Sequence, residues 1–475
     1  MTDADRIAAL EAENAALREA NTALREALAV VGERVAALER GRRTHSQNSS
    51  QPPSQDRQRP QPRSLRGASG KKPGGQPEHE GAFLQMSATP DRVMSQRPAV
   101  CAGCAAPLAG VRADGVERRQ VHDLLPVRLE VLEYQGLRLC CPHCRTLTTG
   151  AFPPGVTASV QYGPRVRATA VCLSQQHLLP YNRAQAVLGD LLGCALSRGT
   201  LAAWVQEAAH ALEDVEAAIA EALRRGTLLH ADETGLSVQG KGWWLHTAST
   251  GSLTHYGVHP KRGREAMDAL GILPCFRGVS MHDGWAPYRG YTCRHVLCNA
   301  HHLRELAGVA EEDGQEWATR LAAWLRAAYH QGGRARARGQ THLPERARAA
   351  IHRRYARLLA QGRAANPPPR EALPRRRGRP KQSKAQNLLD RLEDTAAVLA
   401  FVDDLTLPFD NNQAERDVRM VKVQQKASGT FRSVAGASAF ARIRGYVSTL
   451  RKQSIPVYAA IESLFRGQPL LPTLA

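Results

Sequence analysis

The sequence lacks any apolar run of about 18 residues, the length that a membrane-spanning helix needs. Its first residues also lack the basic and then apolar pattern of a secretory signal peptide. Cysteine is scarce, with 10 in 475 residues, and four of these form two Cys-x-x-Cys pairs, which favours metal binding in a reducing compartment over a disulfide framework. We therefore expect an intracellular, cytoplasmic protein with no membrane partner.

Acidic residues are the scarcer charge: 44 Asp and Glu stand against 64 Lys and Arg, which gives a formal net charge of +20. A chain so basic is expected to bind a polyanion, and nucleic acid is the default partner. Hydrophobic residues make up 43% of the sequence, which is enough for a sizeable core, and the length allows several domains.

Residues 1–40 carry a heptad pattern with Ile7 at position a. The d positions hold apolar residues throughout, namely Leu10, Leu17, Leu24, Val31 and Leu38. Five heptads predict a coiled-coil helix, and asparagine at two a positions, Asn14 and Asn21, favours a parallel two-stranded homodimer. A helix packed on the chain's own body is the alternative. Residues 41–90, rich in Arg, Gln, Pro, Ser and Gly, are predicted as a basic disordered linker.

Residues 91–150 hold the two Cys-x-x-Cys pairs, which are separated by 36 residues. Four thiolates suit tetrahedral Zn²⁺, and each pair keeps two sulfurs within reach of one ion. The predicted ligands are Cys101, Cys104, Cys141 and Cys144, with Cys140 as the alternative to Cys141. Such a site leaves no open position on the ion and is therefore structural. The strand-like segment 120–134 is expected to form the sheet of this zinc ribbon.

The pattern turns helical from 160 to 225. Tyr181 opens one predicted helix, Gly193 ends it, and Ser197 N-caps the next. This order of helix, short glycine-containing turn and helix predicts a helix-turn-helix arrangement, in which Arg198 would contact DNA. A helical bundle with a purely structural role is the alternative.

Acidic residues follow two apolar, strand-like runs. The first run leads into Asp232 and Glu233, and Gly235 follows as a predicted turn. The second run leads into Asp283, and two more strand-like segments lie between the two runs. A strand that buries its body and presents a carboxylate at its end can aim that carboxylate into a cleft without burying it unpaired.

A third acid lies on a predicted helix that starts near Asp410 or Asn411, either of which can N-cap it. At about 3.6 residues per turn, Glu415, Arg419 and Lys422 share roughly one face. Ordinary ion pairing on a solvated helix is the alternative. Two strand ends and one helical carboxylate suit a pair of Mg²⁺ ions in phosphoryl transfer, because carboxylates a few Å apart repel one another unless cations bind them.

In the contexts His-Ala-Asp-Glu-Thr, His-Asp-Gly-Trp and Asp-Asn-Asn-Gln-Ala-Glu-Arg, the three acids resemble the DDE triad of the insertion sequence sixty-six family of bacterial transposases. The resemblance implies that Asp232, Asp283 and Glu415 are catalytic and hold two Mg²⁺, with Mn²⁺ as a substitute. Strand alternation places only one of Asp232 and Glu233 in the cleft, and the family's motif has the aspartate there.

The fold implied by this resemblance is a multidomain α/β protein with a ribonuclease-H-like catalytic core. Residues 226–304 would form the first part of that core. Asp283 and Glu415 are separated by 131 residues, more than a compact core needs, so 305–405 is expected to be a helical insertion. The Glu-bearing helix and the C-terminal helices would occupy 406–475. The family also has a zinc-binding module in front of the core.

Several basic residues are expected to contact DNA. The resemblance implies that Lys422 contacts donor DNA, and Arg416 and Arg419 on the same helix are expected to join it. Within the insertion, Arg377 and Arg379 lie in a basic loop whose Arg-Gly-Arg-Pro resembles an AT-hook core, which enters the minor groove of DNA. A solvated basic loop is the alternative.

The run from Cys298 to Arg304 matches a Cys-x-x-His-x-x-Arg feature of the same family. A second metal site here would need two more ligands, and none is evident in the sequence, so His301 or Arg304 is expected to support the active site. Further on, 437–452 is predicted as a basic amphipathic helix.

Together these features predict a DNA transposase that cleaves the ends of an insertion sequence and joins them to target DNA. Its expected partners are double-stranded DNA, as terminal inverted repeats and as target, a second copy of the chain, and accessory transposition proteins. The bacterial family implies a nucleoid-associated location. A non-catalytic DNA-binding regulator and a ribonuclease-H-like nuclease without strand transfer are the alternatives.

Overall fold

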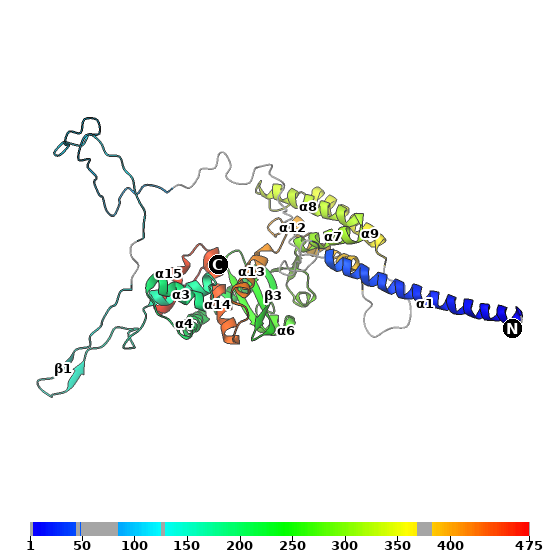
Figure 1. Ribbon diagram of the computed structural model, residues 1–475, viewed down its shortest axis with the longest axis horizontal. Helices are drawn as coiled ribbons and strands as arrows, with labels where there is room; N and C mark the ends of the chain where they lie inside the picture. Colours follow the sequence, from blue (N-terminus) through cyan, green and yellow to red (C-terminus); the bar gives the residue numbers. More distant parts are fainter. Residues whose placement is uncertain (1–2, 44–47, 49–83, 125–128, 368–381, 475) are drawn as a thin grey trace.

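A computed structural model describes residues 3–43, 48, 84–124, 129–367 and 382–474. Most of the predicted linker lies outside these residues, and so do Arg377 and Arg379 of the basic loop. Figure 1 shows a central sheet flanked by helices, with the N-terminal helix projecting to one side and the cysteine-bearing segments on the opposite side.

The predicted N-terminal helix is confirmed, since α1 spans Asp3–Arg43. Its sequence is rich in Ala, Leu, Glu and Arg, which are strong helix formers. The heptad residues Leu17, Leu24 and Leu28 are 59%, 68% and 74% exposed in the single chain. An exposed apolar row of this kind is a surface that a second helix would cover, so the coiled-coil homodimer stays a prediction.

The cysteine-bearing region contains a short antiparallel hairpin, β1 (Arg138–Cys140) and β2 (Leu147–Thr149), on either side of the second Cys-x-x-Cys pair. The strand predicted at 120–134 is wrong for the part of that segment that the structure describes, which has no strand. Leu124 and Val131 are 86% and 88% exposed. These apolar side chains have no packed surface beside them, and a strand without such a surface is marginal in water.

A helical region leads into the sheet. Its elements are α2 (Pro164–Val171), the π-helix η2 (Cys172–Gln176), α3 (Tyr181–Leu192), α4 (Arg198–His210) and α5 (Glu213–Arg225). The predicted helix boundaries are confirmed. Gly193 ends α3 with a φ of 66°, which glycine adopts without strain, and the Ser197 side chain accepts the Thr200 N–H to cap α4.

The central sheet has five strands in the order β5-β4-β3-β6-β7. They are β3 (Leu228–Val238), β4 (Lys241–Ser249), β5 (Thr254–His259), β6 (Val279–His282) and β7 (Arg294–Leu297). Strands β3, β4 and β5 are antiparallel neighbours, whereas β6 and β7 run parallel to β3. The short helices α6 (Arg264–Leu270) and η3 (Ala286–Gly290) lie in the connections.

The first predicted strand is longer than expected, and Gly235 does not form a turn. Strand β3 continues through Gly235 to Val238, and the turn falls at Gln239 and Gly240, whose φ angles are 53° and 74°. Asp232 therefore lies within a strand rather than at its end. Pairing with β4 along this whole length overrides the local turn preference of glycine.

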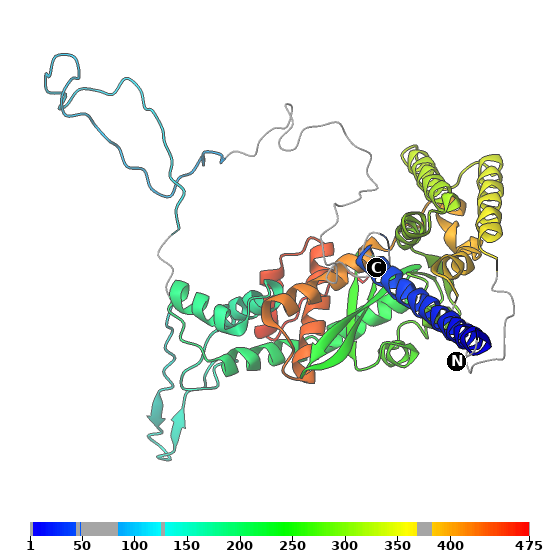
Figure 2. The same ribbon diagram turned by 45° about the vertical axis from the view of Figure 1, so that its right-hand side comes forward.

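After β7 the chain forms a mainly helical insertion, as predicted. Its helices are α7 (Asn299–Asp313), α8 (Glu316–Arg336), α9 (Glu345–Ala365), α10 (Lys384–Leu392), α11 (Thr395–Val398) and α12 (Ala400–Asp403). These helices share a hydrophobic core of their own, in which Leu321, Tyr355 and Leu388 are fully buried. Figure 2 shows the group at one end of the sheet.

The remaining helices are α13 (Asn412–Ser428), α14 (Val434–Lys452) and α15 (Val457–Phe465). The prediction of a basic amphipathic helix at 437–452 is corrected by the burial of α14, which packs on β5 and α4 as a core helix. Even Arg444 is only 3% exposed. Within the described residues, none of the helices combines the length and the apolar character needed to cross a membrane.

Charge placed in the exposed row of α1 should separate a coiled-coil dimer. Leu17→Glu/Leu24→Glu puts two carboxylates at positions that a coiled coil buries, so we expect the full chain to change from dimer to monomer in sedimentation equilibrium. Ala15→Glu/Thr22→Glu adds the same charge outside the a and d positions and is expected to leave the dimer intact. A monomeric wild type, or equal dissociation of both variants, contradicts the coiled coil.

Candidate active site

Adjacent parallel strands bring two of the predicted acids together. Strand β3 pairs with β6 so that His230 lies opposite Met281. The same offset places Asp232 beside Asp283, two residues beyond this pair. The Asp283 carboxylate accepts the Trp285 N–H at 2.8 Å, which fixes it where the chain turns away from β6.

Asn411 attaches the third acid to the same place. Its side-chain oxygen accepts the His230 Nδ1–H at 2.8 Å, and its side-chain amide donates to the Ala231 carbonyl at 2.8 Å. Its backbone N–H donates to the Cys298 sulfur at 3.1 Å, and its backbone carbonyl accepts the Glu415 N–H at 3.1 Å. Asn411 is 1% exposed. One buried residue thus joins β3, the start of α7 and the first turn of α13, and so positions Glu415.

The helix cap differs in detail from the expected one. The Asn411 side chain faces β3 and does not cap α13. The Asp410 carboxylate instead accepts the Asn412 N–H at 3.1 Å. Two neighbouring residues therefore have different roles: Asp410 accepts an N–H at the helix N-terminus, and Asn411 attaches the helix to the sheet.

The carboxylates interact electrostatically. Burial is the main reason that the pKa of Asp232 lies well above its usual value, and the negative charges of Glu233, Asp283 and Glu415 raise it further. Asp283 and Glu415 are therefore both close enough to Asp232 for their charges to act on it. Their oxygens are the hard ligands that Mg²⁺ prefers, and a bound divalent cation would remove this repulsion.

Glu233, the other acid of the pair on β3, is fully engaged by protein groups. Its carboxylate accepts two hydrogen bonds from Arg262, at 2.7 and 3.0 Å, and one from the Tyr288 hydroxyl at 2.5 Å. The Arg262 guanidinium lies over the Trp244 and Trp285 rings, 4.9 and 4.0 Å from their centres. No sequence pattern indicated Arg262 or Tyr288, because both residues reach Glu233 only through tertiary folding.

Two hydrogen-bonded histidines, His282 and His295, support the segment that carries Asp283. His282 accepts the Gly284 N–H, donates from Nε2 to His295 at 3.1 Å, and stacks on the Tyr288 ring at 4.6 Å. His295 in turn donates to the Tyr291 carbonyl at 3.0 Å. Burial lowers the pKa of His282 to about 3, so the imidazole is neutral and serves as a hydrogen-bonded spacer.

Glu415 has two neighbours on α7, His301 and Arg304, whose supporting role in the active site stays a prediction. Arg304 Nη2 lies 3.4 Å and His301 Nδ1 lies 3.6 Å from Glu415 Oε1. Burial, followed by the charge of Arg304, holds the pKa of His301 well below its usual value. Ligand atoms of Cys298, His301 and Glu415 all lie within 4.8 Å of one another, so this trio could also hold a metal ion.

The residues predicted to contact DNA are not gathered in one place. Lys422 donates to the Gly235 carbonyl, and partial burial lowers the pKa of its ammonium. Arg416 and Arg419 are exposed on α13, and Arg198 is exposed at the start of α4. Lys422 therefore also attaches the second turn after Glu415 to the edge of β3.

The two Cys-x-x-Cys pairs adopt matching backbone turns. In each turn, the backbone N–H of the first cysteine donates to the carbonyl of the residue five positions later in the chain. The carbonyl of the same cysteine accepts the N–H of the residue four positions later, and all four hydrogen bonds are 2.9 Å long. The residue after each pair, Ala105 or Arg145, has a positive φ of 57° or 61°. The pKa of Cys144 is lowered to about 7, first by its hydrogen bond with Thr146. No three of the four predicted ligand sulfurs lie within 4.8 Å of one another, so each turn presents half of a site.

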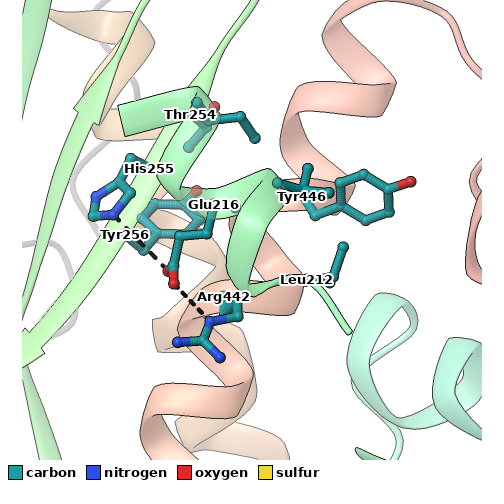
Figure 3. Close-up of a pocket in the computed structure, with 10 residues that line it drawn as sticks. Leu212, Glu216, Thr254, His255, Tyr256, Arg442 and Tyr446 are labelled. Atoms are coloured by element: carbon teal, nitrogen blue, oxygen red, sulfur yellow. Dashed lines mark hydrogen bonds and ion pairs between the residues drawn. The ribbon is translucent and has the colours of Figure 1, made fainter. Parts of the chain in front are cut away.

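A small pocket on another part of the sheet holds an ion-pair cluster. Figure 3 shows Glu216 of α5 pointing towards His255 of β5 and Arg442 of α14. Arg442 Nε donates to Glu216 at 2.6 Å, and His255 lies 3.9 Å from the same carboxylate. Burial lowers the pKa of His255 to about 4. The cluster joins two helices to an outer strand, and it lies apart from the three predicted catalytic acids.

Comparisons with known proteins match the part of the chain that contains these acids. A family model described as the Transposase IS66 family matches residues 159–439, a range that includes Asp232, Asp283 and Glu415. A second model, described as a Family of unknown function (DUF6444), matches residues 2–85. The chain is similar to the Uncharacterized protein y4jD of Sinorhizobium fredii, at 24% identity over 395 residues, which is 78% of this chain and 74% of that protein.

Removing one charge from the acid cluster should stabilise the metal-free protein. Because the pKa of Asp232 is raised on folding, its ionisation disfavours the folded state, and this cost grows as the pH rises above the unfolded value of about 4. We expect Asp232→Asn in EDTA at neutral pH to raise the unfolding temperature by about 2–4 °C, the shift that roughly 1 kcal/mol gives in a domain of 150–250 residues. The difference should shrink as the pH falls.

The matched control for this substitution is Asp190→Asn, which removes an exposed carboxylate from α3 and is expected to leave the unfolding temperature unchanged. Calorimetry of both variants and the wild type measures these unfolding temperatures. An unfolding temperature for Asp232→Asn equal to or below that of the wild type would show that burial and the neighbouring acids do not make ionised Asp232 costly in the folded chain.

Proposed function

The chain belongs to the Transposase IS66 family, and we propose that it cleaves the ends of an insertion sequence and joins them to target DNA by two-metal phosphoryl transfer. The observation that carries the proposal is that the charges of Asp283, at the end of β6, and Glu415, on α13, both act on the buried Asp232 of β3. Such a group is costly to fold unless cations bind it.

The sheet supports the proposal of a ribonuclease-H-like core. Three antiparallel strands are followed by two strands parallel to β3, and the acids lie on the central strand, directly after its parallel neighbour β6, and on a later helix. The helical insertion separates β7 from α13, yet Cys298 and Asn411 at its two ends are in hydrogen-bond contact. The insertion therefore does not disturb the approach of the third acid to the first two.

Asp232, Asp283 and Glu415 would hold two Mg²⁺ or Mn²⁺ ions, which when bound activate the attacking oxygen and stabilise the leaving oxygen. In cleavage, a water oxygen bonds to the phosphorus at the element's end and the 3′ oxygen leaves. In joining, that 3′-OH attacks a target phosphorus and displaces the target's 3′ oxygen. Because Arg262 and Tyr288 already occupy the Glu233 carboxylate, Asp232 is the better ligand on β3.

Basic residues of the chain would hold double-stranded DNA near these acids. Arg416, which donates to the Gln413 side chain at 3.0 Å, and Arg419 would reach phosphates from the exposed side of α13. Lys422 would contact donor DNA from the same helix. Arg198, at the exposed N-terminus of α4, would contact DNA from the helix-turn-helix-like region, and Arg377 and Arg379 from the basic loop.

Two further parts of the proposal concern assembly. The matching turns at Cys101–Cys104 and Cys141–Cys144 support one structural Zn²⁺ held by four thiolates, because each turn presents two sulfurs in the same backbone frame. The exposed heptad row of α1 supports a homodimer, which would let one assembly hold two DNA ends.

Loss of any one of the three acids should abolish joining. With labelled DNA that carries the element's terminal repeats, we expect Asp283→Asn and Glu415→Gln to reduce strand transfer by about a thousandfold, since several kcal/mol of transition-state stabilisation are lost. Asp190→Asn, on the exposed face of α3, is expected to keep wild-type activity. If the wild type cuts DNA but does not join it, the result would favour a nuclease. If the wild type binds DNA but neither cuts nor joins it, the result would favour a non-catalytic regulator.

Zinc content tests the cysteine assignment. We expect Cys101→Ser or Cys141→Ser to lose the single equivalent of zinc from the full chain, because three thiolates bind it much more weakly than four. Cys275→Ser, which removes another exposed cysteine, is the matched control. If both Cys101→Ser and Cys141→Ser retain zinc, the four-thiolate site is contradicted. If Cys140→Ser loses zinc and Cys141→Ser does not, Cys140 rather than Cys141 is the ligand.

A further inference from the structure

Helix α9 of the insertion carries more arginine than its ion pairs use. Two of its arginines face acids: Arg348 lies 4.0 Å from Asp403, and Arg363 lies 2.7 Å from Asp390. The remaining four are exposed and form no ion pair with any residue that the structure describes, namely Arg346, Arg353, Arg354 and Arg357. The helix itself has a single acid, Glu345 in its first turn, so it cannot neutralise this charge.

These four arginines share one face of α9. Positions 346, 353 and 357 follow the spacing i, i+7 and i+11, and 354 is adjacent, so all four fall within a sector of about 100°. The buried residues of α9 lie on the opposite side, and they are Ile351, Tyr355, Leu358, Leu359 and Gly362. The arginines therefore point away from the core of the insertion.

The packing of α9 fixes the direction of this face. A Cβ atom at Gly362 would lie 2.7 Å from the Leu389 side chain and 2.9 Å from Trp317, so the helix backbone is in close contact with both. The Tyr355 hydroxyl also donates to the Leu392 carbonyl at 2.7 Å. Rotation of α9 about its axis would break both contacts, which makes the exposed arginine face a rigid feature of the insertion.

We infer that the arginine face of α9, formed by Arg346, Arg353, Arg354 and Arg357, binds the phosphate backbone of duplex DNA outside the acid cluster. The inference rests on the proposed function, because it assigns the insertion a role in holding the DNA on which the acids act. It adds affinity that does not depend on base sequence.

The dimensions and chemistry of the face suit this partner. From the first to the last arginine the face spans about 16 Å along the helix, and duplex DNA carries one negative charge per roughly 1.7 Å of its axis. The planar guanidinium group binds phosphate oxygens in pairs. Figure 2 shows α9 at the outer side of the insertion, where a duplex can approach it.

The test measures how salt weakens binding of the full chain to a duplex of arbitrary sequence, about 40 base pairs long, without divalent metal. Each phosphate contact contributes about 0.9 to the slope of log K against log salt. We expect Arg353→Gln/Arg354→Gln/Arg357→Gln to reduce the magnitude of that slope by about 2–3. The corresponding triple lysine variant keeps the charge and should retain most of the slope.

A matched triple variant removes the same charge from the neighbouring helix. Arg326, Arg334 and Arg338, on α8 and just after it, are also exposed, and their replacement by glutamine should change the slope by less than about 1. An equal reduction in both triple variants would show that binding follows net charge alone and would overturn the inference. So would an unchanged slope in the α9 variant. Equal unfolding temperatures of the variants and the wild type exclude loss of folding as the cause.

This measurement is independent of the chemistry. Without divalent metal no strand is cut, so a reduced slope in the α9 variant supports the inference even if the wild type fails to join DNA. Conversely, suppose that strand transfer requires Asp283 but the salt slope of the α9 variant is unaltered. The proposed function would then be retained and the role of α9 rejected.

Discussion

Repulsion among carboxylates is the constraint on which the arrangement of this molecule depends. Asp232, Asp283 and Glu415 come from distant parts of the sequence, and their negative charges oppose the fold that brings them together. The sheet supplies the first two through one parallel pairing. The third arrives on a helix whose first turn is attached to the sheet by buried hydrogen bonds. Each hydrogen bond contributes about 1 kcal/mol, so several are needed to offset a repulsion of this kind.

The insertion is compatible with this arrangement because its two ends meet. The backbone N–H of Asn299, where the chain leaves β7, donates to the Phe409 carbonyl at 3.1 Å, and Asn411 contacts Cys298 just beside this bond. All the helices between them pack on a separate core. The loop that the insertion closes is long, yet the cost of closing a loop grows only slowly with its length. A large helical unit can therefore lie between β7 and α13 without moving either element.

The sequence predicted local features well where a short-range rule decides them. Ser197 and Gly193 mark helix ends through capping and positive φ, and the structure has both. Prediction failed where distant contacts decide. Gly235 continues a strand because β4 pairs with it, and α14 is buried because β5 and α4 cover it. Strand alternation and the resemblance to the family's motif predicted Asp232, rather than Glu233, as the catalytic acid. Only the fold gives the partners of Glu233, since Arg262 reaches it from the connection between β5 and α6.

The central claim is that the three acids form one site for a pair of divalent cations. Binding of Mn²⁺ to the full chain, followed by electron paramagnetic resonance, tests it most directly. We predict two Mn²⁺ ions per chain in the wild type and reduced occupancy in Asp283→Asn and in Glu415→Gln. Cys298→Ser removes the thiol of the neighbouring trio but keeps an oxygen that can accept the Asn411 N–H, so we predict unchanged occupancy in this variant. Two ions bound equally well by the wild type and both acid variants, or ions lost only in Cys298→Ser, would contradict the account.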